Sequence, residues 1–208
     1  MTHEVTEAHA NSRLEAFCDG VFAIALTLLI IDVKLPATEN IASTPEFWLA
    51  LQRLTPTILA FILSFGIILI TWVNHHAALK LVDKSSASFM YANGLLLLTV
   101  VFIPFPTALL GEFLLTDHAA PAVVLYDGVL AAQSIGWILM SRTVLKNRLA
   151  SDERSAAAMR ENLKNGYFAL GLYSLLTLAA FWFPLPVAII TLLTWIFWLV
   201  LGMHMKRS

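Results

Sequence analysis

Long runs of apolar residues, separated by short polar stretches, recur along nearly the whole chain. A helix needs about 20 predominantly apolar residues to cross a membrane, because each residue advances ~1.5 Å across ~30 Å of hydrocarbon. Runs of this length lie at about 14–35, 54–76, 87–110, 120–141, 163–183 and 185–204. The pattern therefore predicts an all-α, polytopic membrane protein with six transmembrane helices in a single domain, residues 1–208.

Prolines and one polar segment refine these predicted helices. Pro104 and Pro106 fall late in the third run, where proline removes backbone hydrogen bonds, so a kink or an unwound turn is expected there. Residues 183–186 (Phe-Pro-Leu-Pro) predict a tight turn between the last two helices. Residues 46–53 are expected to form an interfacial stretch before the second span, because Arg53 is unfavourable at mid-membrane.

The composition favours the same class of protein. Of the 208 residues, 59% are hydrophobic and 13% are charged, whereas a soluble domain has about 25% charged residues. The net charge of −1 gives no reason to expect a nucleic-acid partner, and membrane lipid is the expected surrounding. The single cysteine, Cys18, excludes an intrachain disulfide.

The basic residues are distributed unequally between the two predicted sides of the membrane. Of the 13 Lys and Arg residues, only Lys34 and Arg53 flank one side. The remaining 11 flank the other side: Arg13, Lys80, Lys84, Arg142, Lys146, Arg148, Arg154, Arg160, Lys164, Lys206 and Arg207. By the positive-inside rule we expect a multi-pass protein of the cell membrane with both termini in the cytoplasm.

The first apolar run contains a carboxylate, Asp19, in its first third. Such a group is unfavourable in lipid and indicates either a buried polar network or an ion path. Arg13, near the cytoplasmic end, is expected to turn toward a carboxylate. A further hydrogen-bond partner is expected at the same depth near the end of the second run, from Trp72, Asn74, His75 or His76.

The same run carries a stripe of branched apolar side chains with one hydroxyl. At about 100° per residue, Ile24, Thr27, Leu28 and Ile31 fall on one narrow face, and Asp19 falls roughly 140° away from it. The acid and the stripe therefore point in different directions, so Asp19 is not expected to form a charged ring in any pore that the stripe lines. The pattern alone also fits ordinary helix packing or lipid contact.

Several familiar sequence signals do not occur. The chain has no TVGYG-type carbonyl filter, no glycine-rich phosphate loop, no HExxH motif and no arginine-rich voltage-sensing helix. The adjacent His75 and His76 diverge by ~100° on a helix, which does not suit a two-histidine metal site. We therefore expect no enzyme activity, no cofactor and no resident metal.

Three segments carry a resemblance to a known family. Arg13-Leu14-Glu15-Ala16-Phe17-Cys18-Asp19, which runs into GVFAIALTLL, resembles the Arg-x-x-x-Phe-Ser-Asp signature of the transmembrane protein 175 potassium-channel family. The stretches FGIILITWVNHH (65–76) and PFPTALLGEF (104–113) are similar to the same family. Cys18 stands where the family usually has serine, and a thiol is the weaker hydrogen-bond donor.

The resemblance implies a six-helix subunit that forms a homotetramer around a central pore lined by the first helix. It also implies a constriction of apolar side chains at Ile24, Leu28 and Ile31, with a hydroxyl layer at Thr27. The resemblance further implies that a network of polar residues holds the helices together. In this chain its members would be Arg13, Asp19, Trp72 and His75 or His76. The expected function is a channel that conducts K⁺ in preference to Na⁺, with modest discrimination because a carbonyl filter is missing.

Two other classes of function remain open from the sequence. An ion- or proton-coupled secondary transporter could use Asp19 as its coupling carboxylate, since intramembrane acids often have that role. It would show saturable, coupled flux rather than passive current. A structural or lipid-interacting membrane protein would show no flux.

Overall fold

The computed structural model describes residues 2–34, 36 and 41–205, with side chains described between residues 12 and 200 of those ranges. Within this described part the fold is built of helices, and the one pairing of extended backbone is an isolated antiparallel bridge between Val82 and Ala150. The helices are α1 (Thr2–Leu28), the 3₁₀ turn η1 (Leu29–Asp32), α2 (Thr44–Arg53), α3 (Thr55–Leu79), α4 (Ala87–Phe102), α5 (Pro104–Phe113), α6 (Ala119–Lys146), α7 (Glu153–Ala179) and α8 (Pro184–Met205).

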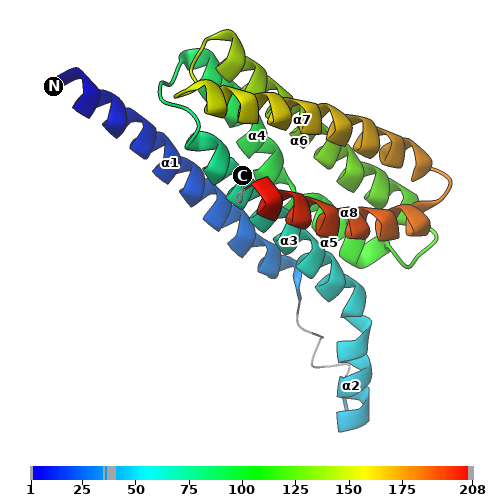
Figure 1. Cartoon of the computed structure of the whole chain (residues 1–208). Coiled ribbons are helices and arrows are strands. Elements are labelled where there is room, and N and C mark those ends of the chain that lie inside the picture. Colours follow the sequence, from blue (N-terminus) through cyan, green and yellow to red (C-terminus); the bar gives the residue numbers. More distant parts are fainter. Residues whose placement is uncertain (1, 35, 37–40, 206–208) are drawn as a thin grey trace.

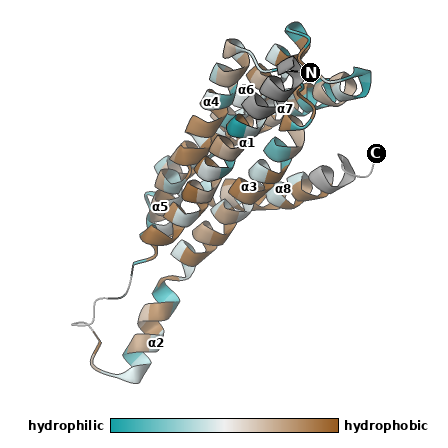
Figure 2. Ribbon diagram, turned by 90° about the vertical axis from the view of Figure 1, so that its left-hand side faces the viewer, coloured by the Kyte–Doolittle hydropathy of each residue, from teal (hydrophilic) through white to brown (hydrophobic). Residues whose placement is uncertain are grey.

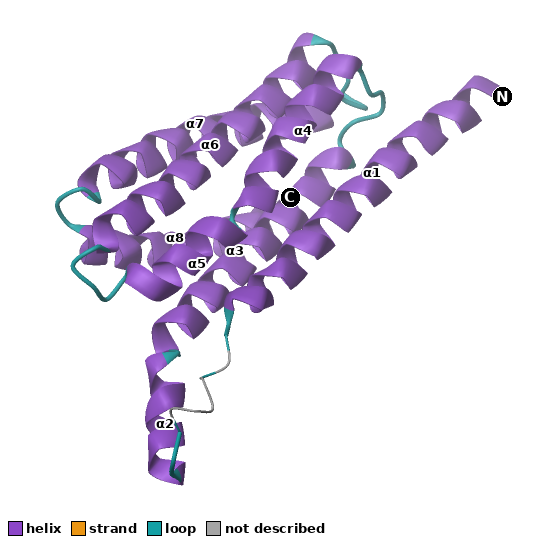
Figure 3. Ribbon diagram, turned by 180° about the vertical axis from the view of Figure 1, so that it is seen from behind, coloured by secondary structure: helices purple, strands orange, loops and turns teal. Residues whose placement is uncertain are grey.

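The long helices form one bundle, with α1 along its edge (Figure 1). α6 and α7 lie side by side as a hairpin, and α4 packs on α6. α1 packs against α3 and α4, as the view from behind shows (Figure 3). α2 projects beyond the end of α3, and Ser43 caps it by accepting a hydrogen bond from the backbone N–H of Glu46. The expected stretch before the second span is thus a separate short helix.

Four segments are long and apolar enough to cross a membrane: Ser12–Asp32, Thr55–Leu79, Ala87–Phe113 and Ala119–Lys146. The described apolar part of α8, Pro184–Val200, is shorter. The first half of α7 is charged, and the helix ends at Ala179 rather than at residue 183. Figure 2 shows hydrophilic residues gathered where α6 and α7 meet, with apolar residues along the shafts of the helices. The fifth and sixth membrane spans therefore stay predictions.

The first helix differs from the predicted span 14–35 at both ends. α1 begins at Thr2, and its α-helical part ends at Leu28, after which η1 continues to Asp32. A 3₁₀ turn often ends an α-helix because its shorter bonds satisfy carbonyls that no longer have a partner four residues on. Here the N–H of Val33 donates to the carbonyl of Ile30 at 3.1 Å. Leu35, the predicted end of the span, lies outside the described residues.

The third predicted span is divided where its prolines predict a break. α4 ends at Phe102 and α5 begins at Pro104. Proline has no N–H to donate, so Pro104 and Pro106 each remove one hydrogen bond from the helix ladder. The prediction of a kink or unwound turn at this place is confirmed.

A glycine sets the distance between α4 and α6. A Cβ atom at Gly136 would lie 2.9 Å from the Cα of Leu96, which is closer than real Cβ contacts allow. Small residues permit such close approach of two helix backbones, and this packing supplies much of the attraction between helices in a membrane. The position of α4, which carries part of the site described next, thus depends on Gly136.

Candidate functional site

α1 has a buried face that joins it to the rest of the bundle. Its members recur at helical spacing and are almost completely buried: Cys18, Phe22, Ala25 and Leu29. They pack in one core cluster with residues of α3, α4 and α6. This spacing of four, three and four residues is the signature of one helix face, so the buried face leaves the predicted stripe free of contact with the subunit core.

The predicted stripe is exposed on the single chain. We name Ile24, Thr27, Leu28 and Ile31 the α1 stripe; its aliphatic members are 58%, 37% and 67% exposed in that order. The Thr27 hydroxyl donates its hydrogen to the carbonyl of Ile24 at 2.9 Å. Its oxygen therefore keeps lone pairs that can face outward. Like the exposed apolar side chains of the other helices, this face is suited to contact with lipid, with other subunits or with a narrow pore.

Asp19 points away from the α1 stripe, toward α3. Its Oδ1 accepts a hydrogen bond from Nε1 of Trp72 at 2.8 Å. This bond replaces part of the hydration that a carboxylate loses inside a bundle. It also fixes the rotation of α1, because Trp72 is held in α3.

A second connection joins α1, α3 and α4. Asn93 of α4 donates from Nδ2 to Sγ of Cys18 at 3.2 Å and accepts at Oδ1 from Nε2 of His75 at 2.6 Å. All three residues are buried. Since the amide oxygen accepts only, the imidazole of His75 carries its hydrogen on Nε2. We call Cys18, Asp19, Trp72, His75 and Asn93 the α1 anchor.

His76 and Arg13 lie at the edge of the α1 anchor. Nδ1 of His76 is 2.9 Å from Oε1 of Glu15, both side chains being about one-third exposed. The contact lacks hydrogen-bond geometry. Arg13 is exposed and takes part in none of the ion pairs among the described side chains. It does not reach Asp19 within this chain because the two lie on different faces of α1.

The structure thus brings together only some of the residues named from the sequence. Trp72 reaches Asp19, whereas His75 bonds to Asn93 of α4 and His76 lies beside Glu15 of α1. Arg13 takes part in no ion pair among the described side chains. Asn74, the fourth candidate, lines a cavity on the other side of α3. Asn93 was missed, although an amide in the middle of an apolar run is a signal that could have indicated it.

Other buried polar groups lie farther from α1. Ser64 Oγ contacts the Thr107 and Tyr126 hydroxyls at 2.6 and 2.9 Å, and Thr191 donates to Oδ1 of Asp127 at 2.8 Å. Among the described side chains, no three His, Cys, Asp or Glu residues gather closely enough to hold a metal ion. These contacts tie helices together and present no set of reactive groups.

Comparison with known proteins assigns the chain to a family. Residues 13–104 match the family described as endosomal/lysosomal potassium channel TMEM175. A potassium channel of Chamaesiphon minutus is 40% identical over 171 residues, which cover 82% of this chain and 84% of that protein. This chain belongs to the TMEM175 family of potassium channels.

Another relative and a solved structure agree with membership of the TMEM175 family. A potassium channel of Streptomyces collinus is 42% identical over 135 residues, covering 62% of this chain and 64% of that protein. The crystal structure of a lysosomal potassium-selective channel TMEM175 homolog from Chamaesiphon minutus superposes with a TM-score of 0.83 and 34% identity. That match covers 93% of this chain and 98% of the homolog, so the fold is that of a TMEM175 subunit.

The residues that match the TMEM175 family include both parts of the site. Residues 13–104 extend from α1 to the first residue of α5. The α1 stripe and every member of the α1 anchor lie within this segment. The chemistry that it offers is a line of apolar side chains and one hydroxyl layer on an exposed helix face, with the polar groups turned inward.

Proposed function

We propose that this protein is a cation channel that conducts K⁺ in preference to Na⁺ through a pore lined by α1. The observation that carries the proposal is the exposure of the α1 stripe, whose aliphatic side chains are 37–67% exposed on the single chain. Four copies of the chain around an axis would place four such stripes face to face. The membership of a potassium-channel family supports the same arrangement.

In the proposed pore, Ile24, Leu28 and Ile31 form the constriction. A narrow apolar neck excludes water and ions together, so such a pore closes by dewetting and conducts when a small rotation or widening lets water return. No carbonyl filter is part of the proposal. Thr27 contributes hydroxyl oxygens, which are suited to a dehydrating cation because their hydrogens are directed to the helix backbone.

Selectivity in this proposal follows from dehydration. K⁺ holds its water less firmly than Na⁺, so it passes an apolar neck at lower cost. The single layer of four Thr27 hydroxyls compensates only part of the lost hydration, and the preference for K⁺ is therefore modest.

The proposed topology has six membrane spans per subunit, with α7 and α8 as the fifth and sixth. The basic residues at the ends of α3, α6 and α7 favour the cytoplasm for that end of the bundle and for both termini. The apolar outer faces of the helices contact lipid in the cell membrane. The α1 anchor then lies near the cytoplasmic side and holds the pore helix to α3 and α4.

A secondary transporter that uses Asp19 is the less well supported function. Asp19 is directed to Trp72 rather than to the exposed face of α1, where a transported ion would pass. If Asp19 anchors α1, we expect its mutation to lower the stability of the protein and not only to abolish coupled transport. The transporter thus requires Asp19 to leave a hydrogen bond that the fold provides.

The test is the ionic current of the purified protein in planar bilayers, with K⁺ on one side and Na⁺ on the other. A passive current that reverses toward the K⁺ equilibrium potential is expected. The variant Asp19→Asn separates the channel from the transporter. A channel keeps its passive current in this variant as long as the variant folds. Coupled uptake that disappears in Asp19→Asn, without any passive current in the unmodified protein, would contradict the proposal.

A further inference from the structure

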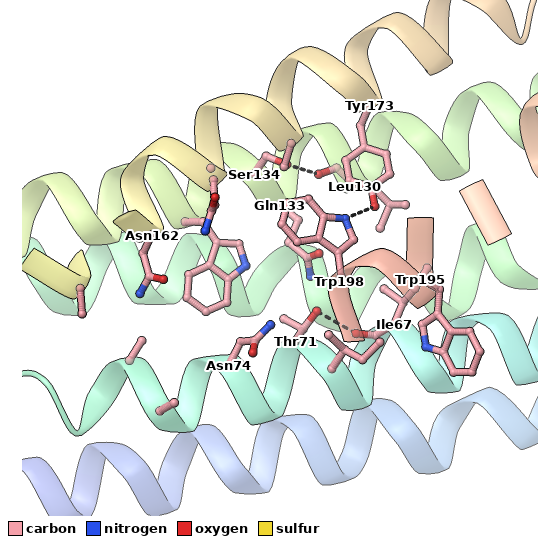
Figure 4. Close-up of a pocket in the computed structure, with 18 of the residues that line it drawn as sticks. Ile67, Thr71, Asn74, Leu130, Gln133, Ser134, Asn162, Tyr173, Trp195 and Trp198 are labelled. Carbon is pink, nitrogen blue, oxygen red and sulfur yellow. Dashed lines mark hydrogen bonds between the residues drawn. The ribbon is translucent and has the colours of Figure 1, made fainter. Parts of the chain in front are cut away.

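A cavity of ≈ 220 Å³ lies between α3, α6, α7 and α8, on the side of α3 that faces away from α1 (Figure 4). One water molecule needs only about 10–15 Å³ of such space. The cavity is therefore large enough for a small organic molecule. It is separate from the α1 stripe and from the α1 anchor.

The walls of the cavity combine aromatic rings with uncharged polar groups. Trp137, Tyr173 and Trp198 supply broad apolar surfaces, and amide side chains are contributed by Asn74 and Asn162. No lining residue in the described part of the chain is charged. An ionic ligand would lose its water here without gaining an opposite charge, which is unfavourable, so the lining selects an uncharged one.

Two lining side chains, Gln133 of α6 and Trp195 of α8, have a buried N–H group without a hydrogen-bond partner among the described residues. Gln133 of α6 is 7% exposed, and its Nε2 bonds to no described residue. Figure 4 shows the Gln133 side chain extending from α6 toward Thr71 and Asn74 of α3. A buried N–H without an acceptor is costly, and native proteins seldom keep one without a reason. The amide thus presents a hydrogen-bond donor to whatever occupies the cavity.

Several polar side chains of the cavity wall are satisfied by the protein itself. Ser134 donates to the carbonyl of Leu130 at 2.9 Å, and Thr71 donates to that of Ile67 at 2.8 Å. The indole N–H of Trp198 donates to the Tyr173 hydroxyl at 2.9 Å. The surrounding helices therefore leave Gln133 available as a donor, together with the indole N–H of Trp195.

We propose that this cavity binds a small, uncharged molecule that has an apolar body and a hydrogen-bond acceptor oxygen. The apolar body lies against the aromatic rings, and the oxygen accepts from Nε2 of Gln133. The amides of Asn74 and Asn162, which are only half-buried, form a polar entrance, so the ligand comes from water rather than from the acyl chains of the bilayer. The site does not depend on the channel function proposed above.

Tribromoethanol is a suitable probe, because it is a neutral alcohol whose bromines scatter anomalously and quench tryptophan fluorescence. Crystals of the full chain soaked with the probe are expected to show bromine between α3, α6, α7 and α8, with the probe oxygen beside Gln133. In nanodiscs, titration of the full chain is expected to show a saturable component of tryptophan quenching.

Two variants with matched controls connect the binding to the cavity. Gln133→Leu keeps the side-chain size but removes the donor, and should weaken the saturable binding about threefold to tenfold, as for one hydrogen bond. The control Ser141→Ala changes a buried polar residue of α6 that does not line the cavity and should leave the affinity unchanged. Ala158→Phe fills the cavity from its rim and should abolish saturable quenching, whereas Ala157→Phe on the exposed face of α7 should not.

Three results would overturn the proposal. One is bromine density confined to the outer surface of the bundle, or present in crystals without any saturable quenching in nanodiscs. Another is an affinity that neither Gln133→Leu nor Ala158→Phe changes, in samples shown to be folded and monodisperse. The third is bromine density from a brominated-acyl lipid between α3, α6, α7 and α8 in crystals grown with that lipid, which would assign the cavity to a lipid chain.

Discussion

A carboxylate inside a helix bundle is tolerated when hydrogen bonds replace the water that it has lost. In this chain Trp72 gives Asp19 such a bond, and Asn93 connects Cys18 with His75 one turn away. These residues come from three separate helices, α1, α3 and α4. The rotation of α1 about its axis, and with it the direction of the α1 stripe, depends on these few contacts.

Replacing Trp72 with Phe keeps the ring packing but removes the donor to Asp19. Because the carboxylate is only partly buried, we expect a loss of about 1–2 kcal/mol in the free energy of unfolding. The measurement is the thermal midpoint of the purified protein in detergent. Trp182→Phe, at an exposed position, is the matched control and should have little effect. Equal midpoints for the two variants would show that the bond to Asp19 contributes nothing.

At the scale of elements, close contact between helices depends on residues that have no side chain in the way. Gly136 and Gly128 lie on the same helix, α6, yet their surroundings differ. A Cβ at Gly136 would meet the backbone of Leu96 at 2.9 Å, whereas one at Gly128 would meet only a methyl group of Thr177 at 3.9 Å. The two positions therefore separate helix propensity from helix packing.

We expect Gly136→Ala to destabilise the protein and Gly128→Ala not to. Overpacking costs about 1–3 kcal/mol, which outweighs the ~1 kcal/mol by which alanine is the better helix former. At Gly128 only the gain in helix propensity applies. Thermal midpoints of both variants in detergent test this; a midpoint for Gly136→Ala at or above that of Gly128→Ala would show that α4 and α6 can separate at no cost.

The beginning of α7 is predicted to be sensitive to pH. Oδ1 of Asp152 accepts from the backbone N–H of Ser155 at 2.7 Å, and this hydrogen bond, helped by the Ser155 side chain, holds the pKa of Asp152 below its usual value. A carboxyl whose pKa is lowered by folding stabilises the fold above its ordinary pKa and loses that effect as the pH falls.

The difference in thermal midpoint between the unmodified protein and Asp152→Ala should therefore be largest near neutral pH and shrink on acidification through the aspartate range. Asp152→Asn is the control, because asparagine also caps helices but does not titrate. Its midpoint relative to Asp152→Ala should stay constant with pH. The same pH dependence in Asp152→Asn would mean that another group is responsible.

The periodicity of the sequence predicted where helices form. It predicted less well where they end and which of them are long and apolar enough to span a membrane. Pro104 and Pro106 act within one turn of their own position, so the division into α4 and α5 was predictable. The transition from α1 to η1 at Leu28 was not, because it depends on how the last carbonyls find donors. Nor did hydropathy show that the fifth predicted run begins inside the charged half of α7.

At the scale of the whole molecule, the proposed gate gives a direct prediction. Ile31→Asn would place amides in the apolar neck, lower the cost of hydrating it and raise the resting conductance in planar bilayers. We expect an increase of at least severalfold. Leu175→Asn, which puts the same amide on the exposed surface of α7, should leave the conductance unchanged. An unchanged conductance in Ile31→Asn would remove Ile31 from the gate.

By itself the sequence determined the properties that depend on near neighbours along the chain: helical segments, the break at Pro104, the asymmetry of basic residues and the α1 stripe. Only the tertiary structure decided which partner each polar group finds. It joined Asp19 to Trp72, placed Asn93 between Cys18 and His75, left Arg13 exposed and turned Asn74 to a cavity on the opposite side of α3. The physical reason is that helical periodicity reports the face on which a residue lies, whereas its contact depends on the rotation and spacing of helices far apart in sequence.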